Sequence, residues 1–174
     1  MRLSAAWIRQ AESDLQAGKK LDIPDRPSTF CQALSKYQQA VEKSVKGLAS
    51  VLHEGGVLSA GLSKKHAVAS LFSAILKIPR SEDNRDYMEK LERVFAGSRQ
   101  QYLKELDDLA PIYPAPGKLH AKNHEYPFQD ASGDWHSPCD DNAFTSGEMK
   151  RFRVIANQIS NLGKIVKALE LIYP

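Results

Sequence analysis

PSTFCQALSKYQQAVEKSVKGLASVLH, residues 27–53, is the stretch that decides the fold of this chain of 174 residues. Its apolar side chains recur every three or four positions, so they line one face of a helix. These are Phe30, Leu34, Tyr37, Val41, Val45, Leu48 and Leu52. Residues 28–29, Ser-Thr, mark its start and residues 55–56, Gly-Gly, mark its end, with Gly47 an internal weak spot costing about 1 kcal/mol relative to Ala. The pattern predicts one long amphipathic helix, the spine of a helical bundle.

Upstream of this spine, residues 4–21 form a second amphipathic helix. Its apolar side chains follow one another at four-residue steps: Leu3, Trp7, Ala11 and Leu15. Residues 22–27 contain two prolines, which cannot continue a helix, so we expect the first two helices to be antiparallel neighbours. Trp7 is expected in the core, and Glu42 with Lys46 has the spacing of an ordinary i,i+4 ion pair.

Two further helical stretches follow the spine. Ser63 can cap a helix over residues 63–78, which ends before Pro79. Residues 81–109 are predicted as one long helix that the break at Gly97 can interrupt, and two shorter helices are the alternative.

The C-terminal part begins with the spacing of a capping box, Thr145 to Glu148, and an apolar seam then predicts a second long helix over residues 145–174. Before it, residues 111–144 are rich in Pro, Gly, Asn, Asp and His and show almost no periodicity. Since β-type alternation of useful length is missing, the predicted fold is all-α. We expect an up-and-down bundle of four to five helices in one domain, residues 1–174, with this long irregular loop before the C-terminal helix.

Composition gives little direct information on function. The net charge of +3 is too small to argue for nucleic acid, and the two cysteines, Cys31 and Cys139, are too sparse for a disulfide scaffold. The first residues become polar before any apolar run of signal-peptide length, and nowhere do about 18 uncharged apolar residues follow one another. We therefore expect a cytoplasmic protein without a membrane anchor.

The loop over residues 111–144 is the candidate site, because loops of this length are functional or disordered. It contains three of the five histidines of the chain, His120, His124 and His136. Two of them are four residues apart and could bind a metal ion, with His136 or Cys139 as a third ligand. No HExxH or CxxC motif accompanies them, and we expect no metal ion and no cofactor.

A second interpretation is a phosphate site. Lys118, His120, Lys122 and His124 would form a cationic cluster, with Tyr126 or Trp135 stacking on a base. Arg151, in the basic start of the last helix, also suits a phosphate contact. The candidate nucleotide- or phosphate-binding residues are thus His120, Lys122, Tyr126 and Arg151. The remaining interpretation is that residues 111–144 are a solvent-exposed connection whose aromatic residues pack against the bundle.

Two segments resemble a known family. WIRQAESDL at residues 7–15 and QQAVEKSVKGL at residues 38–48 are similar, in this order, to the HEPN family, the higher eukaryotes and prokaryotes nucleotide-binding domain. His66, EYP at residues 125–127 and FTSGE at residues 144–148 also fit its pattern. The resemblance implies a helical bundle, a homodimer in many members, and roles from metal-independent ribonuclease to nucleotide binder or partner of a nucleotidyltransferase.

The ribonuclease members of that family carry an Arg followed by a His four to six residues later. No Arg of this chain has a His at that distance, and the nearest substitutes are Lys118 with His124 and Lys46 with His53. Because Lys lacks the planar fork of Arg, we expect a binding or partner module that engages a nucleotide, RNA or a nucleotidyltransferase-type partner, more readily than an enzyme. The alternative is an atypical metal-independent ribonuclease with His124 as acid or base and Lys118 or Lys122 as electrostatic stabiliser.

Overall fold

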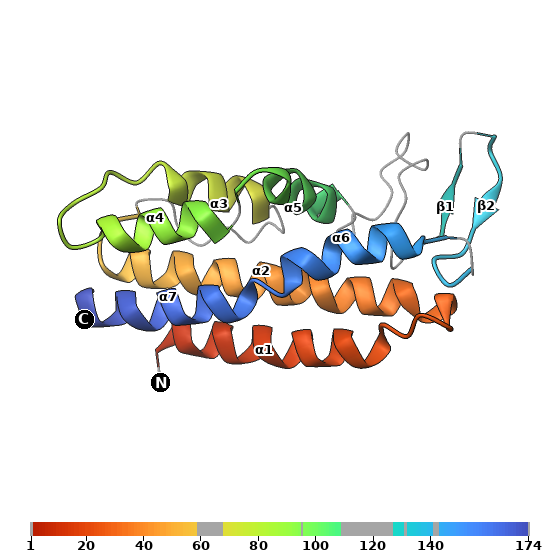
Figure 1. The fold of residues 1–174 in the computed structure, drawn as a ribbon, viewed down its shortest axis with the longest axis horizontal. Coiled ribbons are helices and arrows are strands. Elements are labelled where there is room, and N and C mark those ends of the chain that lie inside the picture. Colours follow the sequence, from red (N-terminus) through yellow and green to blue (C-terminus); the bar gives the residue numbers. More distant parts are fainter. Residues whose placement is uncertain are drawn as a thin grey trace.

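The computed structural model describes residues 2–58, 68–94, 96–108, 127–130, 132–140 and 143–173. These residues form a bundle of helices with a small two-stranded sheet at one end (Figure 1). The helices are α1 (Leu3–Leu21), α2 (Phe30–Glu54), α3 (Val68–Leu76), α4 (Arg85–Val94), α5 (Ser98–Asp108), α6 (Ser146–Ala156) and α7 (Ile159–Ile172). A 3-10 helix, Pro27–Thr29, precedes α2, and the strands are β1 (Phe128–Gln129) and β2 (Trp135–His136). The predicted all-α fold is confirmed.

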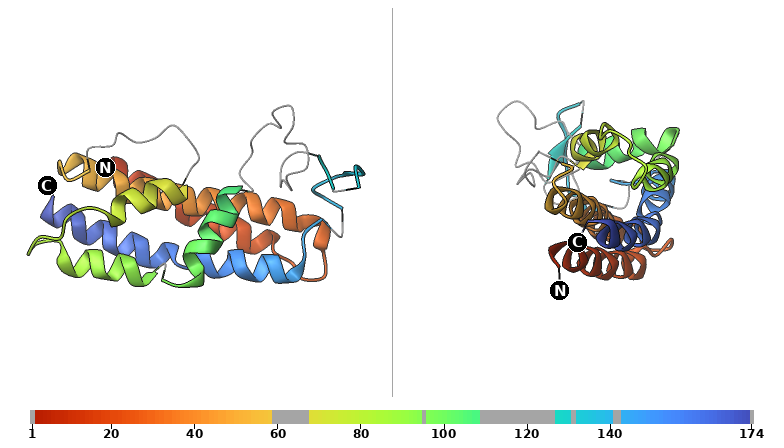
Figure 2. Two further views of the ribbon diagram at one scale, coloured as in Figure 1. Left: turned by 90° about the horizontal axis from the view of Figure 1, so that it is seen from above. Right: turned by 90° about the vertical axis from the view of Figure 1, so that its left-hand side faces the viewer.

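Helix α2 is the centre of the bundle and packs against α1, α3, α6 and α7 (Figures 1 and 2). Each of the seven apolar side chains that predict this helix is at most 2% exposed. Other faces of α2 are buried as well, as the full burial of Ala33, Ala40 and Ala49 shows. The helix is therefore covered on more sides than an amphipathic stripe predicts.

Two glycines allow α1 and α2 to lie close together. A Cβ atom at Gly47 would lie 3.1 Å from the Cδ1 atom of Ile8 and 3.1 Å from the carbonyl oxygen of Ser4. A Cβ atom at Gly18 would lie 2.8 Å from the ring of Tyr37. Close-packed interiors leave no room for such an atom without displacement. Gly47, a weak spot by helix propensity, is thus a site of close helix packing.

The helices form layers. Helices α3, α4 and α5 lie on one side of α2, α6 and α7, and α1 lies on the other (Figures 1 and 2). Across the layers, α4 packs against α7 and α5 against α6. Both ends of the described chain lie at the same end of the bundle, where the Arg2 guanidinium donates hydrogen bonds to the carbonyl oxygens of Glu170 and Tyr173.

The helix predicted over residues 81–109 is two helices, α4 and α5, so the prediction of one continuous helix is wrong and its alternative is correct. Gly97, between them, has a φ of +63°. A residue with a Cβ rarely adopts this conformation, and an α-helix cannot pass through it. The break therefore follows from the backbone freedom of one glycine.

The long C-terminal helix is also two helices. It begins with the predicted capping box, in which the Thr145 hydroxyl accepts from the Glu148 amide and the Glu148 carboxylate accepts from the Thr145 amide. Helix α6 then ends at Ala156, and α7 begins at Ile159. The Gln158 amide donates to the carbonyl oxygen of Ile155 at 2.9 Å, three residues back. This tighter, 3-10-type turn interrupts the α-helical ladder without a Pro or Gly to signal it.

Part of the segment predicted as irregular, residues 111–144, is a β-hairpin. Strands β1 and β2 are antiparallel, and the Asp130 carboxylate accepts hydrogen bonds from the amides of Ser132 and Asp134 in the turn between them. The His136 imidazole lies 3.1 Å from the other oxygen of Asp130. This contact, followed by the amide of Asp134, lowers the pKa of the Asp130 carboxyl below its usual value.

Candidate functional site

The structure leaves most of the predicted site untested. Lys118, His120, Lys122, His124 and Tyr126 lie outside the described residues. Trp135, His136 and Cys139, the other candidates of this loop, are described, and Trp135 is 59% exposed on β2. Of the four candidate nucleotide- or phosphate-binding residues, only one, on α6, belongs to the described chain.

That member is Arg151, and it faces a carboxylate of the protein itself. Its Nε atom lies 3.3 Å from Glu105 Oε2, on α5, and the two side chains are 41% and 32% exposed. The Nε atom is buried and has no partner in hydrogen-bond geometry among the described residues. A phosphate at Arg151 would thus compete with Glu105 for the same cation.

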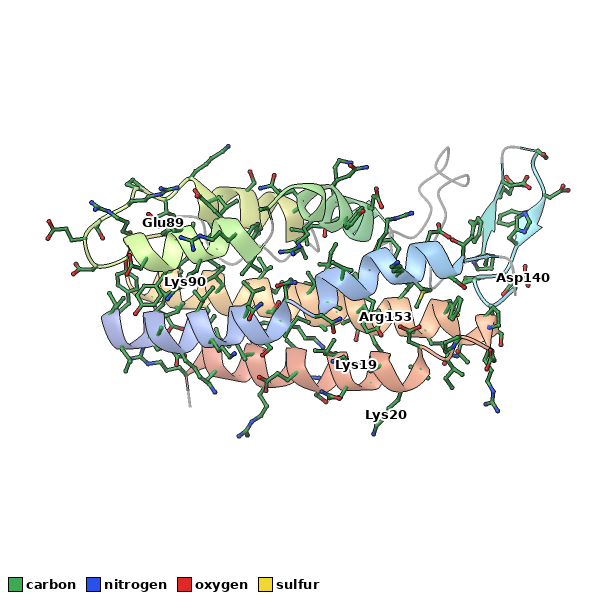
Figure 3. The ribbon with its side chains drawn as sticks, in the orientation of Figure 1. Lys19, Lys20, Glu89, Lys90, Asp140 and Arg153 are labelled. Carbon is green, nitrogen blue, oxygen red and sulfur yellow. The ribbon has the colours of Figure 1, made fainter. Side chains whose placement is uncertain are left out.

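A groove between α4 and α7 is the most suitable binding site in the described chain. Its volume is about 350 Å³, within the range of pockets that bind small molecules, roughly 300–1,000 Å³. Polar and aromatic side chains line its rim: Tyr87 and Lys90 from α4, Asn161 and Lys164 from α7. Apolar side chains form its floor: Val94, Ile165 and Ala168. Figure 3 shows Lys90 on the side of α4 that faces α7.

The charge of this groove is positive. The ammonium group of Lys90 lies 5.4 Å from the centroid of the Tyr87 ring, a cation–π distance. Within the described residues, neither Lys90 nor Lys164 has a carboxylate within salt-bridge distance, whereas the neighbouring Glu89 pairs with Arg93. Two uncompensated cations beside an apolar floor and an aromatic ring suit an anionic ligand with a flat apolar part.

A second cavity, between α1 and α7, has a different charge. It is smaller, about 250 Å³, and contains the cations Arg9 and Lys167 together with the carboxylates Glu12 and Glu170. Opposite charges balance there, so an anion gains little by binding. The α4–α7 groove is therefore the better candidate.

The charged side chains of residues 38–48, which resemble the HEPN family, pair with other side chains of the bundle. The Glu42 carboxylate accepts hydrogen bonds from Gln38 at 3.1 Å and from Lys46 at 2.5 Å, which confirms the predicted ion pair. Lys46 also lies over the Trp7 ring of α1, 5.5 Å from its centroid. Asp14, on the same helix, pairs with two more lysines of α2, Lys36 and Lys43. These contacts hold α1 against α2 and leave the motif a structural role.

Arg153, the other arginine of α6, is held by a buried carboxylate (Figure 3). Its guanidinium donates two hydrogen bonds of 2.7 Å to Asp22, which follows α1, and the hydroxyl of Tyr37 donates a third to the same carboxylate. The side chain of Asp22 is 3% exposed. This cluster ties α1, α2 and α6 together and takes Arg153 away from ligand binding.

The cluster predicts a loss of stability at alkaline pH. Burial, and then the hydrogen bond to Asp22, raise the pKa of Tyr37 above its ordinary value. In the unfolded chain the phenol ionises near pH 10, whereas in the folded chain it stays protonated, so stability falls as the pH rises above about 10. Tyr37→Phe should remove up to about 1.4 kcal/mol per pH unit of this slope. Urea unfolding between about pH 9 and 11 measures it.

Burial also raises the pKa of the Cys31 thiol, to about 11. Ionisation of this thiol in the unfolded chain therefore lowers the free energy of unfolding in an overlapping pH range. The difference between the wild type and Tyr37→Phe isolates the contribution of the tyrosine. Equal slopes for the two proteins would contradict the prediction.

No local pattern in the sequence indicates the groove. By sequence, Tyr87 and Ile165 fit apolar helical patterns, and Lys90 and Lys164 look like ordinary exposed lysines. Their positions differ by more than seventy residues along the chain, and only the packing of α4 on α7 brings them together.

Metal binding and membrane insertion find no support in the described part of the chain. There, no group of three or more His, Cys, Asp or Glu side chains could hold a metal ion. Of the helices described, none combines the length and apolar character that crossing a bilayer requires.

Comparison with known proteins gives one match. The model of the HEPN domain matches residues 4–110, more than half of the chain, from α1 to the end of α5. Neither the curated proteins nor the solved structures contain a significant match. The matched region contains both segments that carry the resemblance and the α4 wall of the groove, while α7 lies beyond it. The chain belongs to the HEPN domain family.

Proposed function

We propose that this protein is a nucleotide-binding HEPN module, with the α4–α7 groove as its binding site. The single observation that supports this function is the pairing of a tyrosine ring over an apolar floor with two lysines that, among the described residues, have no carboxylate within salt-bridge distance. A nucleotide has the matching parts, a phosphate group and a flat base. The family match supports a nucleotide- or RNA-related role in general terms.

Each rim residue has a role in this proposal. Lys90 and Lys164 neutralise the phosphate from the two sides of the groove, as point charges that tolerate several geometries. The base lies on the apolar floor and against Tyr87, since base–aromatic stacking contributes about 1–3 kcal/mol per base. Asn161, whose amide donates to Gln158 at 2.9 Å, has a further donor and its carbonyl oxygen to offer the base edge.

Calorimetry with AMP, ATP, adenosine and inorganic phosphate tests the proposal. Saturable binding is expected for the nucleotides, with an affinity that falls as salt is raised because exposed charges are screened. Adenosine should bind more weakly and with little salt dependence. Absence of saturable binding by any nucleotide would contradict the proposed function.

Removing one groove cation should weaken nucleotide binding. We expect Lys90→Ala or Lys164→Ala to lower the affinity for ATP about tenfold, because a charge-assisted contact contributes about 1.5–3 kcal/mol and 1.4 kcal/mol is a factor of ten. Lys20→Ala is the matched control. It removes the same charge from an exposed site on α1, on the far side of the bundle (Figure 3). Equal losses in all three variants would show that net charge, not the groove, attracts the ligand.

The other predicted properties are part of the same proposal. A homodimer is tested by light scattering of the purified protein. A nucleotidyltransferase-type partner is tested by the neighbourhood of the gene. RNA cleavage that is abolished by His124→Ala would replace the binding module with the ribonuclease alternative.

A further inference from the structure

The two cysteines of the chain, 108 residues apart, meet at the end of the bundle that bears the hairpin. The Sγ atoms of Cys31 and Cys139 are 3.3 Å apart, and both thiols are free. Cys31 is the second residue of α2, and Cys139 lies between β2 and α6. The sequence predicts no disulfide scaffold, yet the fold places the only two thiols of the chain in contact.

The segment around Cys139 is fixed by hydrogen bonds. The Ser137 amide donates to the carboxylate of Asp140 at 2.8 Å, and the Cys139 amide donates to the hydroxyl of Ser137 at 3.2 Å. Ala143 and Phe144, which follow, are at most 5% exposed and anchor the segment in the core. Cys139 is thus held next to α2 by its surroundings.

The two thiols differ in access to solvent. Cys31 is 2% exposed, whereas Cys139 is exposed. Burial, and then the contact with Cys139, raise the pKa of the Cys31 thiol to about 11, so this thiol remains protonated near neutral pH. A dissolved reagent therefore reaches Cys139 first, and Cys31 is the thiol that reacts second.

We propose that Cys31 and Cys139 are a redox-active pair, in which a small-molecule disulfide such as glutathione disulfide converts the two thiols into an intramolecular disulfide. The thiolate of Cys139 attacks one sulfur of glutathione disulfide, forms a mixed disulfide and releases one glutathione thiolate. Cys31 then loses its proton to solvent and attacks the Cys139 sulfur, and the second glutathione leaves. The protein loses two electrons and two protons, and one glutathione disulfide becomes two glutathione molecules.

The bond would have a defined structural effect. It would join the first turn of α2 to the segment that leads from the hairpin into α6, at the end of the bundle opposite the chain ends (Figure 1). The closed loop would contain nearly all of α2, the helices α3, α4 and α5, and both strands of the hairpin. This inference is independent of the nucleotide site, since it uses none of the groove residues.

The test equilibrates reduced protein with glutathione buffers of increasing disulfide content, followed by acid quenching, alkylation and mass spectrometry. The expected product is a monomer lighter by two hydrogen atoms, with one crosslinked peptide that contains Cys31 and Cys139. The oxidised form should unfold at a temperature higher by about 5–15 °C, since closing a loop of this length restricts the unfolded chain. Protein that stays reduced, accumulates only glutathione on Cys139, or forms only linked dimers would overturn the proposal.

Two variants separate the roles of the cysteines. Cys31→Ser should accumulate the mixed disulfide on Cys139, because the second thiol is missing. In Cys139→Ser, Cys31 should stay unmodified at glutathione concentrations that fully oxidise the wild type. Modification of Cys31 at the wild-type rate would contradict the proposed order. Circular dichroism checks that both variants fold, and the wild-type experiment decides the proposal if one does not.

Discussion

Leu48→Ala should lower the free energy of unfolding by about 2–5 kcal/mol, the range measured for large-to-small changes in protein cores. Leu48 is fully buried and lies on α2, the helix that α1, α3, α6 and α7 surround. Truncation removes apolar contacts and leaves a cavity that several helices would have to move to fill. Urea unfolding followed by circular dichroism measures the effect.

Gln32→Ala on the same helix is the matched control. Gln32 is exposed, and a substitution at such a position usually changes stability by no more than about 0.5 kcal/mol. Similar losses for the two variants would mean that burial of the Leu48 side chain does not cause the effect, since Ala has the highest helix propensity and neither change weakens the helix by that route. A loss below about 1 kcal/mol for Leu48→Ala would contradict the central position of this helix.

Asp22→Ala should cost about 2–3 kcal/mol, the second large effect. The change removes the acceptor of three hydrogen bonds, two from Arg153 and one from Tyr37. The Tyr37 hydroxyl would then be left in the core without its acceptor, and an unsatisfied buried group costs about 1–3 kcal/mol. Arg153, 42% exposed, can turn to solvent and recover part of its loss. Thermal and urea unfolding measure the result.

Asp25→Ala provides the comparison for this variant. Asp25 lies in the same turn after α1 but is exposed, so its loss should change stability by no more than about 0.5 kcal/mol. A double-mutant cycle of Asp22→Ala with Tyr37→Phe should show positive coupling, since the two side chains share one hydrogen bond. Additive effects would show that the cluster does not act as a unit.

Local signals in the sequence predicted α1, α2 and the start of α6, whereas the helices predicted over residues 81–109 and 145–174 are each two helices. The apolar rhythm of residues 27–53 found the buried face of α2, and the spacing of Thr145 and Glu148 found the start of α6. The pair of Glu42 and Lys46 was also predicted. All of these depend on residues within a few positions of one another, where helix geometry fixes which side chains meet.

Predictions that depended on distant residues were incomplete. By helix propensity, Gly47 is a weak spot of α2, yet in the structure it allows α1 to pack closely against α2. Arg153 belongs to the basic start of α6, yet the carboxylate of Asp22, which follows α1, holds it. The part of the predicted site that lies outside the described residues stays a prediction, whereas Arg151, the candidate on α6, faces Glu105.

The sequence by itself determined the all-α class, the central helix and the HEPN family, because periodicity, capping and short motifs are local properties. The tertiary structure alone decided which charges are satisfied inside the bundle and which remain for a ligand. It also decided that Lys90 and Lys164 line the same groove and that Cys31 contacts Cys139. The physical reason is that helix packing brings these pairs together across long separations in the chain, and no local pattern records a neighbour that arrives only on folding.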